Sequence, residues 1–211
     1  MRSKIWPIMF MGLLALSVLV VDEVPLAQAQ NTSLRGDYNF TFTRTCSQAA
    51  VSGSSNPVGP FVLTGVVHFD GAGGGSLSGR QFLLGTAFNG TVGAGIDDGN
   101  GSEFFIPQAD ITSCGVTYSV SANGSFSQTM NSCILTFQTG GGTIFEGNTA
   151  SLSGLTISGT LNLDGNVLVL DSSLSVEPAT DVETFTWTSG PNSGIASKRI
   201  CKGAGLATSQ R

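Results

Sequence analysis

The sequence predicts an all-β protein: an antiparallel meander of about 8–10 strands that closes into a barrel, with a two-sheet β-sandwich as the alternative. Three observations support this fold class. Apolar and polar residues alternate with a period of two over most of the chain after Ala29, and helical periodicity is absent there. Asp-Gly and Asn-Gly pairs, which favour tight hairpins, separate several alternating runs. A meander of this length must also hide its edges, and pairing of its first and last strands would do so.

The strands follow one another at regular intervals. They are expected at residues 37–43, 61–69, 116–120, 126–130, 155–163, 167–170, 184–187 and 195–201. Tight turns are expected at three pairs of residues that tolerate a positive φ: Asp70-Gly71, Asn123-Gly124 and Asp164-Gly165. The run Gly71–Ser76 is interpreted as a flexible hairpin end, and residues 48–60 and 85–102 as long irregular loops.

The first 29 residues have the layout of a secretory signal peptide. Arg2 and Lys4 are followed by an apolar run over 8–21 and by the small-residue signature Ala27-Gln28-Ala29. The apolar run of about 14 residues is shorter than the roughly 20 that a membrane-spanning helix needs. We therefore expect cleavage after Ala29 and export to the periplasm, the cell surface or the medium. A single all-β domain over residues 30–211, with no membrane span, is expected to remain.

The four cysteines are expected to form two disulfides in that oxidising compartment. Cys114 and Cys133 flank a predicted hairpin, while Cys46 and Cys201 belong to the first and last predicted strands. Of the three possible connectivities we favour Cys114–Cys133 with Cys46–Cys201, which would fasten the closure of a barrel.

The register of the hairpin at Asn123-Gly124 tests this pairing. A strict two-residue turn places the cysteines opposite one another, but it puts Val120 opposite Ser127 and splits the apolar side chains between two faces. A bulged loop puts Tyr118 opposite Gln128 and Val120 opposite Phe126 on one face, so we prefer it. The disulfide then needs a second irregularity near Asn131-Ser132.

The charge pattern argues against a nucleic-acid partner. Charged residues make up 11% of the chain and the net charge is −5. Between Gln81 and Ser197 there is no Lys or Arg but there are ten acidic residues, whereas phosphate binding needs clustered cations. The basic cluster of Lys198, Arg199 and Lys202 is expected to be solvated on a terminal strand.

No catalytic or cofactor motif is recognisable. The single histidine, His68, falls on the face of its strand opposite to the core-facing Val67 and Phe69, and no G-x-S-x-G motif accompanies it. A zinc site with two or three histidines is excluded. The sequence therefore predicts a protein that is not an enzyme and that needs no cofactor.

Two weaker hypotheses concern carboxylates. Asp97, Asp98 and Glu103 surround a glycine-rich loop and form a weak calcium candidate, although the segment does not fit an EF-hand. A hydrolase that uses two opposed carboxylates is a further alternative, for which spacing alone identifies no pair.

The aromatic residues supply the leading functional hypothesis. Tyr38, Phe40, Tyr118 and Trp187 are candidates to line an interior cavity, since barrels of about eight strands can hold one small ligand; the alternative is that they fill the core. We expect a secreted, non-catalytic protein that binds a small apolar ligand or another cell-surface component. The alternative from another class is a structural subunit of an extracellular layer or filament, which the low charge and abundant Gly, Ser and Thr suggest.

Several motifs are shared with a known group of proteins. Gly36-Asp37-Tyr38-Asn39-Phe40, the run from Gly65 through Phe69-Asp70-Gly71 to Gly79, and the segment Gly115–Ser125 follow one another in that order. The chain resembles a group of uncharacterised secreted bacterial β proteins with the motifs G-x-Y-x-F, F-D-G-x-G and G-T-Y-x-V. It departs from them by an inserted Val116 and by Asn123 near the usual Asp. The resemblance implies no activity and no site residue, and likeness to lipocalin or avidin barrels is an architectural analogy.

Overall fold

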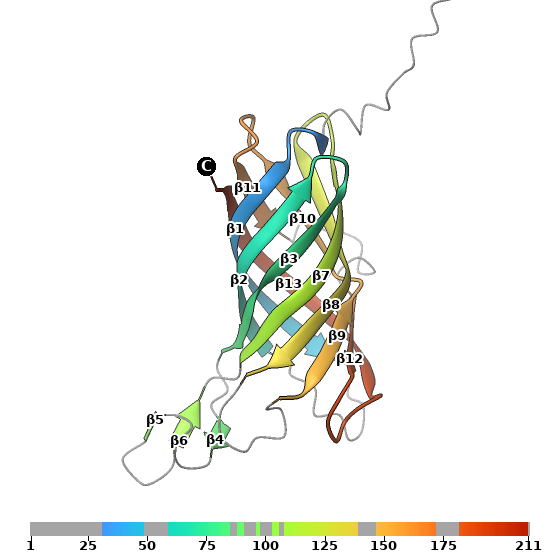
Figure 1. Cartoon of the computed structure of the whole chain (residues 1–211). Coiled ribbons are helices and arrows are strands. Elements are labelled where there is room, and N and C mark those ends of the chain that lie inside the picture. Colours follow the sequence, from blue (N-terminus) through green and yellow to red (C-terminus); the bar gives the residue numbers. More distant parts are fainter. Residues whose placement is uncertain are drawn as a thin grey trace, which may run out of the picture.

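A computed structural model describes residues 31–48, 59–84, 88–90, 96–97, 103–105, 108–138, 147–171 and 182–210. These residues form an all-β structure, which confirms the predicted class (Figure 1). The predicted signal peptide and its cleavage site lie outside the described residues. The strands of the main sheet are β1 (Arg35–Gln48), β2 (Gly59–Asp70), β3 (Gly74–Leu83), β7 (Gln108–Val120), β8 (Ser125–Phe137), β9 (Thr149–Ser153), β10 (Thr156–Leu161), β11 (Val167–Asp171), β12 (Val182–Trp187) and β13 (Ala196–Ser209).

The main sheet closes on itself. Strands β1, β2, β3, β7 and β8 pair in sequence order, and β8 then pairs with β10 near its start and with β9 near its end. Strand β13 pairs in the same way with both β11 and β12, and it returns to β1 along residues Tyr38–Gln48. The strands thus form a ring (Figure 1), so the predicted meander closes between its first and last strands and the sandwich alternative is not adopted.

Alternation along each strand separates the inside of the ring from its outside. In β1, five alternate residues are buried and the residues between them are exposed: Tyr38, Phe40, Phe42, Arg44 and Cys46 point inward. The inward apolar side chains of all the long strands belong to one core cluster that fills the ring. The predicted alternation therefore assigned the faces of these apolar residues correctly. The same alternation places Arg44 on the inward face of β1.

Two irregularities bring the second pair of cysteines together. Tyr118 of β7 lies opposite Gln128 of β8, as the bulged loop requires, while Cys114 lies opposite Cys133. The register shifts between Gly115 and Val116, and Asn131 of β8 is left without an opposite residue. This is the irregularity that the sequence predicted, and it turns both cysteines into the core, where they form a disulfide.

Glycines make room for the large inward side chains of β1. Phe40 lies opposite Gly65 of β2, and Phe42 lies opposite Gly205 of β13. Gly65 in turn lies opposite Gly79 of β3, so the two backbones approach closely. A Cβ at Gly65 would sit 2.1 Å from the carbonyl oxygen of Ser78, a distance that real Cβ atoms do not show. Phenylalanines on one strand thus lie opposite glycines on its neighbours, which lets the sheet coil tightly.

Replacing Gly65 by Ala is expected to destabilise the protein by about 2–3 kcal/mol, because the added methyl meets backbone that cannot rotate away. Gly115→Ala is the matched control, since a Cβ there meets nothing within 4 Å and the residue is exposed. Urea denaturation of both variants measures the difference. Equal stabilities for the two variants would show that the sheet relaxes freely around Gly65.

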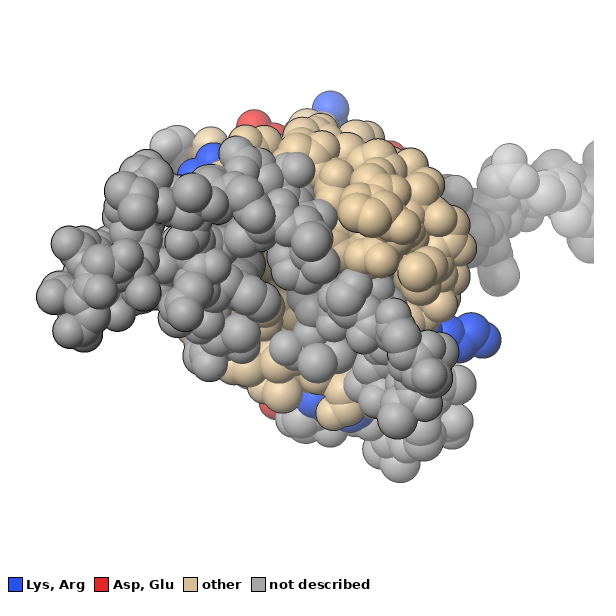
Figure 2. Space-filling model, turned by 90° about the horizontal axis from the view of Figure 1, so that it is seen from below, with Lys and Arg blue, Asp and Glu red and all other residues tan. Residues whose placement is uncertain are grey.

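The two ends of the ring differ. Residues 71–73, 121–124 and 162–166 make short connections at one end, here called the turn end, and residues 31–34 lie there (Figure 1). Asn31 accepts a hydrogen bond from the Val120 N–H through Oδ1 (2.9 Å), and Leu34 is fully buried. At the opposite end, here called the loop end, β1, β3 and β8 end and β2, β7 and β9 begin, and residues 188–195 connect β12 to β13. Seen from the loop end, the described surface consists mainly of uncharged residues, with Lys and Arg atoms near its edges (Figure 2).

Part of a connection predicted to be irregular contains strands. Strands β4 (Phe88–Gly90), β5 (Ile96–Asp97) and β6 (Glu103–Phe105) form a separate three-stranded sheet between β3 and β7. The glycine-rich run is also a correction: β3 begins at Gly74, so its second half belongs to the ring instead of a flexible hairpin end. The loop expected over 48–60 falls largely outside the described residues.

The turn between β2 and β3 is held by one carboxylate. Asp70 Oδ1 accepts hydrogen bonds from the backbone N–H groups of Ala72, Gly73 and Gly74 at 2.7, 3.0 and 2.9 Å. These bonds, with that of Ala72 first, lower the pKa of Asp70 below its ordinary value of 3.8. The ionised form is therefore favoured by folding.

Stability should accordingly depend on the charge of Asp70 in acid. A lowered pKa in the folded state contributes stability that is present above pH 3.8 and is lost as the pH falls through the folded value. We expect Asp70→Asn to remove this part of the pH dependence, as measured by denaturation at several pH values down to and below 3.8. Parallel pH profiles for the wild type and the variant would contradict the assignment.

Candidate functional site

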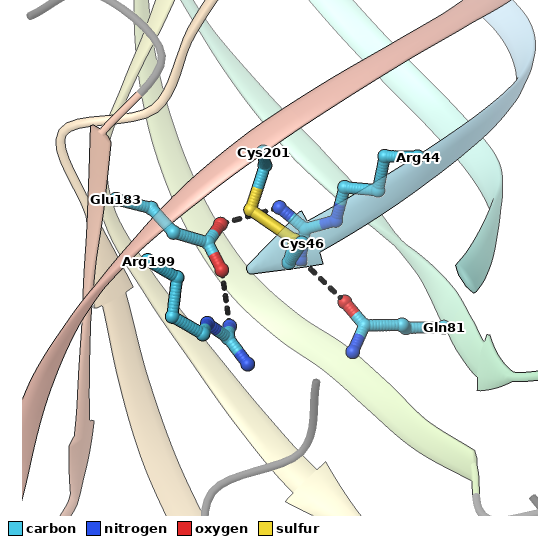
Figure 3. The surroundings of a disulfide bond; sticks show 6 residues. All are labelled: Arg44, Cys46, Gln81, Glu183, Arg199 and Cys201. Carbon is cyan, nitrogen blue, oxygen red and sulfur yellow. Dashed lines mark hydrogen bonds and ion pairs between the residues drawn. A yellow bond between two sulfur atoms is a disulfide. The ribbon is translucent and has the colours of Figure 1, made fainter. Parts of the chain in front are cut away.

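Four polar side chains converge inside the ring, in the half nearer the loop end. Arg44 from β1, Gln81 from β3, Glu183 from β12 and Arg199 from β13 point toward one another (Figure 3). Their exposed fractions are 1%, 4%, 0% and 0%, so the group is sealed from solvent. We call these four residues the arginine cluster. Buried polar groups in an otherwise apolar core require a specific explanation, because burying them without partners is costly.

Glu183 is the centre of the cluster. Its Oε2 accepts a hydrogen bond from Nη1 of Arg44, and its Oε1 accepts one from Nη2 of Arg199. The second terminal nitrogen of Arg44 donates to Oε1 of Gln81 at 2.9 Å. Glu183 and Arg199 lie directly opposite one another on β12 and β13, so strand pairing places this ion pair.

A disulfide lies beside the cluster. Cys46 follows Arg44 by two residues on the inward face of β1, and Cys201 follows Arg199 by two residues on β13. The two cysteines are opposite partners and are joined as the sequence predicted (Figure 3). Their sulfur atoms and a Glu183 oxygen lie within 4.8 Å of one another. Because each sulfur is bonded to the other, neither offers a thiolate to a metal ion.

Two aromatic rings hold the guanidinium groups. The guanidinium carbon of Arg44 lies 5.3 Å from the centroid of Phe61, and that of Arg199 lies 4.4 Å from the centroid of Phe185. Arg199 also lies 5.7 Å from the Phe61 centroid, so this ring serves both arginines. Cation–π contact and the planar shape of both groups restrict how the arginines can turn.

Burial and the carboxylate of Glu183 dominate the electrostatics of the cluster. Two guanidinium groups share the single carboxylate of Glu183. Burial lowers the pKa of Arg199 to about 10; Glu183 opposes this shift and Arg44 adds to it. Nε of Arg44 is buried and has no hydrogen-bond partner in the described part of the chain. The cluster thus keeps one buried donor, the Nε–H of Arg44, without an acceptor among the described residues, which is costly unless an oxygen atom reaches it.

The four aromatic residues predicted to line a cavity do not gather at one place. Tyr38 and Tyr118 pack edge-on against Phe69 near the turn end, with ring centroids 5.4 and 4.8 Å away. The Tyr118 hydroxyl donates to the backbone carbonyl of Leu34 at 2.9 Å. Trp187 instead packs against Phe185, 5.2 Å away, in the loop-end half. All of them are buried core residues, which was the alternative interpretation.

Phe40 does line a cavity, but a small one. The cavity has a volume of about 20 Å³, which is room for about one water molecule. Phe42, Met130 and Ile157 are among its apolar walls, and Gln128 adds one polar group. A ligand of several heavy atoms therefore does not fit inside this part of the ring without displacing side chains.

The remaining candidate residues lie away from the cluster. Asp97 and Glu103 are opposite partners on β5 and β6; their side chains and the whole of Asp98 lie outside the described residues, so the calcium hypothesis stays a prediction. His68 and Asp37 pair on the outer surface, with Nδ1 and Oδ1 2.7 Å apart and exposed fractions of 56% and 52%. The expectation of a surface histidine is confirmed.

Sequence reasoning missed the arginine cluster. Arg199 was expected to be solvated with its basic neighbours; this is wrong for Arg199, which is fully buried, although Lys198 and Lys202 are exposed. The signal was present in the alternation. Arg44 lies between two inward residues of β1, and Arg199 shares the face of Cys201, which the predicted disulfide already placed inside.

Comparison with protein families, with curated proteins and with solved structures finds no match for this chain. In the described residues, no helix has the length and apolar character needed to cross a membrane. The two disulfide pairs are consistent with an oxidising, exported environment. The function is therefore argued from the geometry of the site alone.

Proposed function

We propose that this chain is an exported, non-catalytic binding protein that takes a small ligand at the arginine cluster. The observation that carries the proposal is the buried arginine cluster, in which Nε of Arg44 has no hydrogen-bond partner in the described part of the chain. A network that served stability alone would gain from using every buried donor, because a donor without an acceptor carries a desolvation cost. The closed ring supplies the frame that brings the four side chains of the cluster together from β1, β3, β12 and β13.

The arrangement around Glu183 supports binding in preference to catalysis. Both carboxylate oxygens accept hydrogen bonds from guanidinium groups, so neither is directed at a substrate. Glu183 is also the one acidic residue among the buried residues that the structure describes. Hydrolysis by opposed carboxylates would need a second one at a suitable distance.

Native mass spectrometry of the full chain, purified without reductant or denaturant from the cells that make it, tests the proposal. We expect a mass above that of the disulfide-bonded polypeptide, and we expect the excess to disappear on denaturation. Arg44→Met should lose the excess mass, whereas Arg80→Met should keep it, because Arg80 lies on the outer surface paired with Asp110. A bare polypeptide mass, together with no thermal shift on adding the low-mass fraction of the growth medium, would reject a binding function.

A further inference from the structure

We infer that the interior of the ring holds a second polar site: the cavity of about 20 Å³ binds one water molecule, which is held by the side-chain amide of Gln128. The inference is independent of the proposed binding function, because the cavity and the arginine cluster share no residue. It follows from three features of the cavity: its place in the core, the amide in its wall and its size.

The cavity lies within the packed core. Its walls come from β1, β2, β3, β8, β10, β11 and β13, so it is surrounded by strands from most of the ring. Each residue of these walls has an exposed fraction of 7% or less. A molecule bound here therefore exchanges with solvent only when the core opens transiently, and its residence time should be long.

Gln128 is the polar residue of these walls. It lies between Phe126 and Met130 on the inward face of β8, where alternation otherwise places apolar side chains, and its exposed fraction is 6%. Strand β8 pairs with β7 on one side of Gln128 and with β10 on the other. The backbone groups of these strands thus serve the ladder of the sheet, and the amide of Gln128 needs another partner.

The described residues offer no hydrogen bond to this amide. Tyr118 lies directly opposite Gln128 on β7, but its hydroxyl donates to the carbonyl oxygen of Leu34 at 2.9 Å. The same hydroxyl accepts from the N–H of Gly71, also at 2.9 Å. Ile157, the opposite residue on β10, is apolar. A buried amide without a partner is costly, and a water molecule in the cavity relieves that cost.

Size and chemistry select water as the occupant. A volume of about 20 Å³ exceeds the roughly 10–15 Å³ that one water molecule needs, and a guest of several heavy atoms does not fit. A buried water needs at least two polar partners. The primary amide supplies both, because its Oε1 accepts and its Nε2 donates, and one water can bond to these neighbouring atoms together. The rest of the wall is apolar and has no group to hold an ion.

Nuclear magnetic resonance of the disulfide-bonded protein tests the inference. Met130 and Ile157 line the cavity, and their methyl protons are bound to carbon and do not exchange chemically with water. We expect Overhauser cross-peaks between these methyl groups and water. The cross-peaks should have opposite signs in the laboratory frame and the rotating frame, as those of a long-lived bound water do. Their absence from the wild type overturns the inference, whatever the variants show.

Two variants test whether the amide holds the water. Gln128→Leu replaces the amide by an apolar side chain, so the cross-peaks to Met130 and Ile157 should disappear. The thermal midpoint should stay the same or rise, because the amide and its water are removed together. Gln138→Leu makes the same chemical change at an exposed position just after β8 and should keep the cross-peaks. Cross-peaks that persist in Gln128→Leu would overturn the role of Gln128.

Xenon distinguishes a hydrated cavity from a dry one, because dry apolar cavities bind it. We expect xenon under pressure to leave the methyl resonances of Met130 and Ile157 in the wild type where they are. Xenon-induced shifts of these resonances, without cross-peaks to water, would show that the cavity is dry and would overturn the inference.

Discussion

Replacing Glu183 by Gln is expected to destabilise the protein by about 3–5 kcal/mol, the largest effect of a single substitution that we foresee. The two guanidinium groups that share this carboxylate are fully buried or nearly so. Without it they face one another inside the ring with no opposite charge among the described residues. The substitution conserves the shape of the side chain, so the loss measures charge compensation and not packing. Urea denaturation at neutral pH gives the change in the free energy of unfolding.

Two variants show whether the effect belongs to charge balance. Arg44→Met leaves one arginine with one carboxylate, so it should cost clearly less than Glu183→Gln. Asp110→Asn breaks the ion pair with Arg80 on the outer surface, which is partly exposed and should contribute at most about 1 kcal/mol. A Glu183→Gln variant no less stable than Asp110→Asn would mean that the arginine cluster is not held together by its carboxylate.

The ring itself could be predicted from local information. Each strand of the meander is defined by alternation over a few residues, and each tight turn by a residue pair that tolerates a positive φ. Gly71, Gly124 and Gly165 all adopt that conformation in the structure. The three tight turns pair β2 with β3, β7 with β8 and β10 with β11 without long-range information. The pairings of β9 with β8 and β12 are not local, and β9 was not among the expected strands. Closure needed one long-range observation, and the cysteines in the first and last strands supplied it.

The glycine-rich run was misread because glycine has two different uses. Flexibility was the expectation for Gly71–Ser76, but β3 begins at Gly74. A Cβ at Gly75 would lie 2.2 Å from the carbonyl oxygen of His68, so this position is glycine because two strands approach closely. Composition alone does not distinguish a glycine that is needed for its backbone conformation from one that is needed because a Cβ would clash with a neighbouring strand.

The arginine cluster could not be predicted by the rules that predicted the ring. Alternation gives the face of a residue, but charged residues are assigned to the solvent unless a partner is known. The partners of Arg44 come from β3 and β12, which are far away in the sequence. These side chains come together only because the ring closes and because β13 pairs in a fixed register with β1 and β12. Both features follow only from the complete set of strand pairings.

Removing the disulfide between Cys46 and Cys201 is expected to cost about 5 kcal/mol, against about 3 kcal/mol for the one between Cys114 and Cys133, on the loop-closure model. The cysteines of the first pair are 155 residues apart in the sequence and those of the second 19. The longer loop loses more entropy on closure, so its removal frees more conformations of the unfolded chain. Replacing both cysteines of each pair by Ala avoids a free thiol in either variant.

The folded ring should survive both replacements, because Tyr38–Gln48 of β1 pairs with β13 along its whole length whether or not the sulfurs are joined. The stability difference should therefore come from the unfolded state. A longer unlinked chain exposes more surface, so the Cys46→Ala/Cys201→Ala variant should also show the steeper dependence of unfolding free energy on urea. Equal losses and equal slopes for the two variants would instead place the effect in the folded state. The pairing of β1 with β13 beside the arginine cluster would then depend on the disulfide.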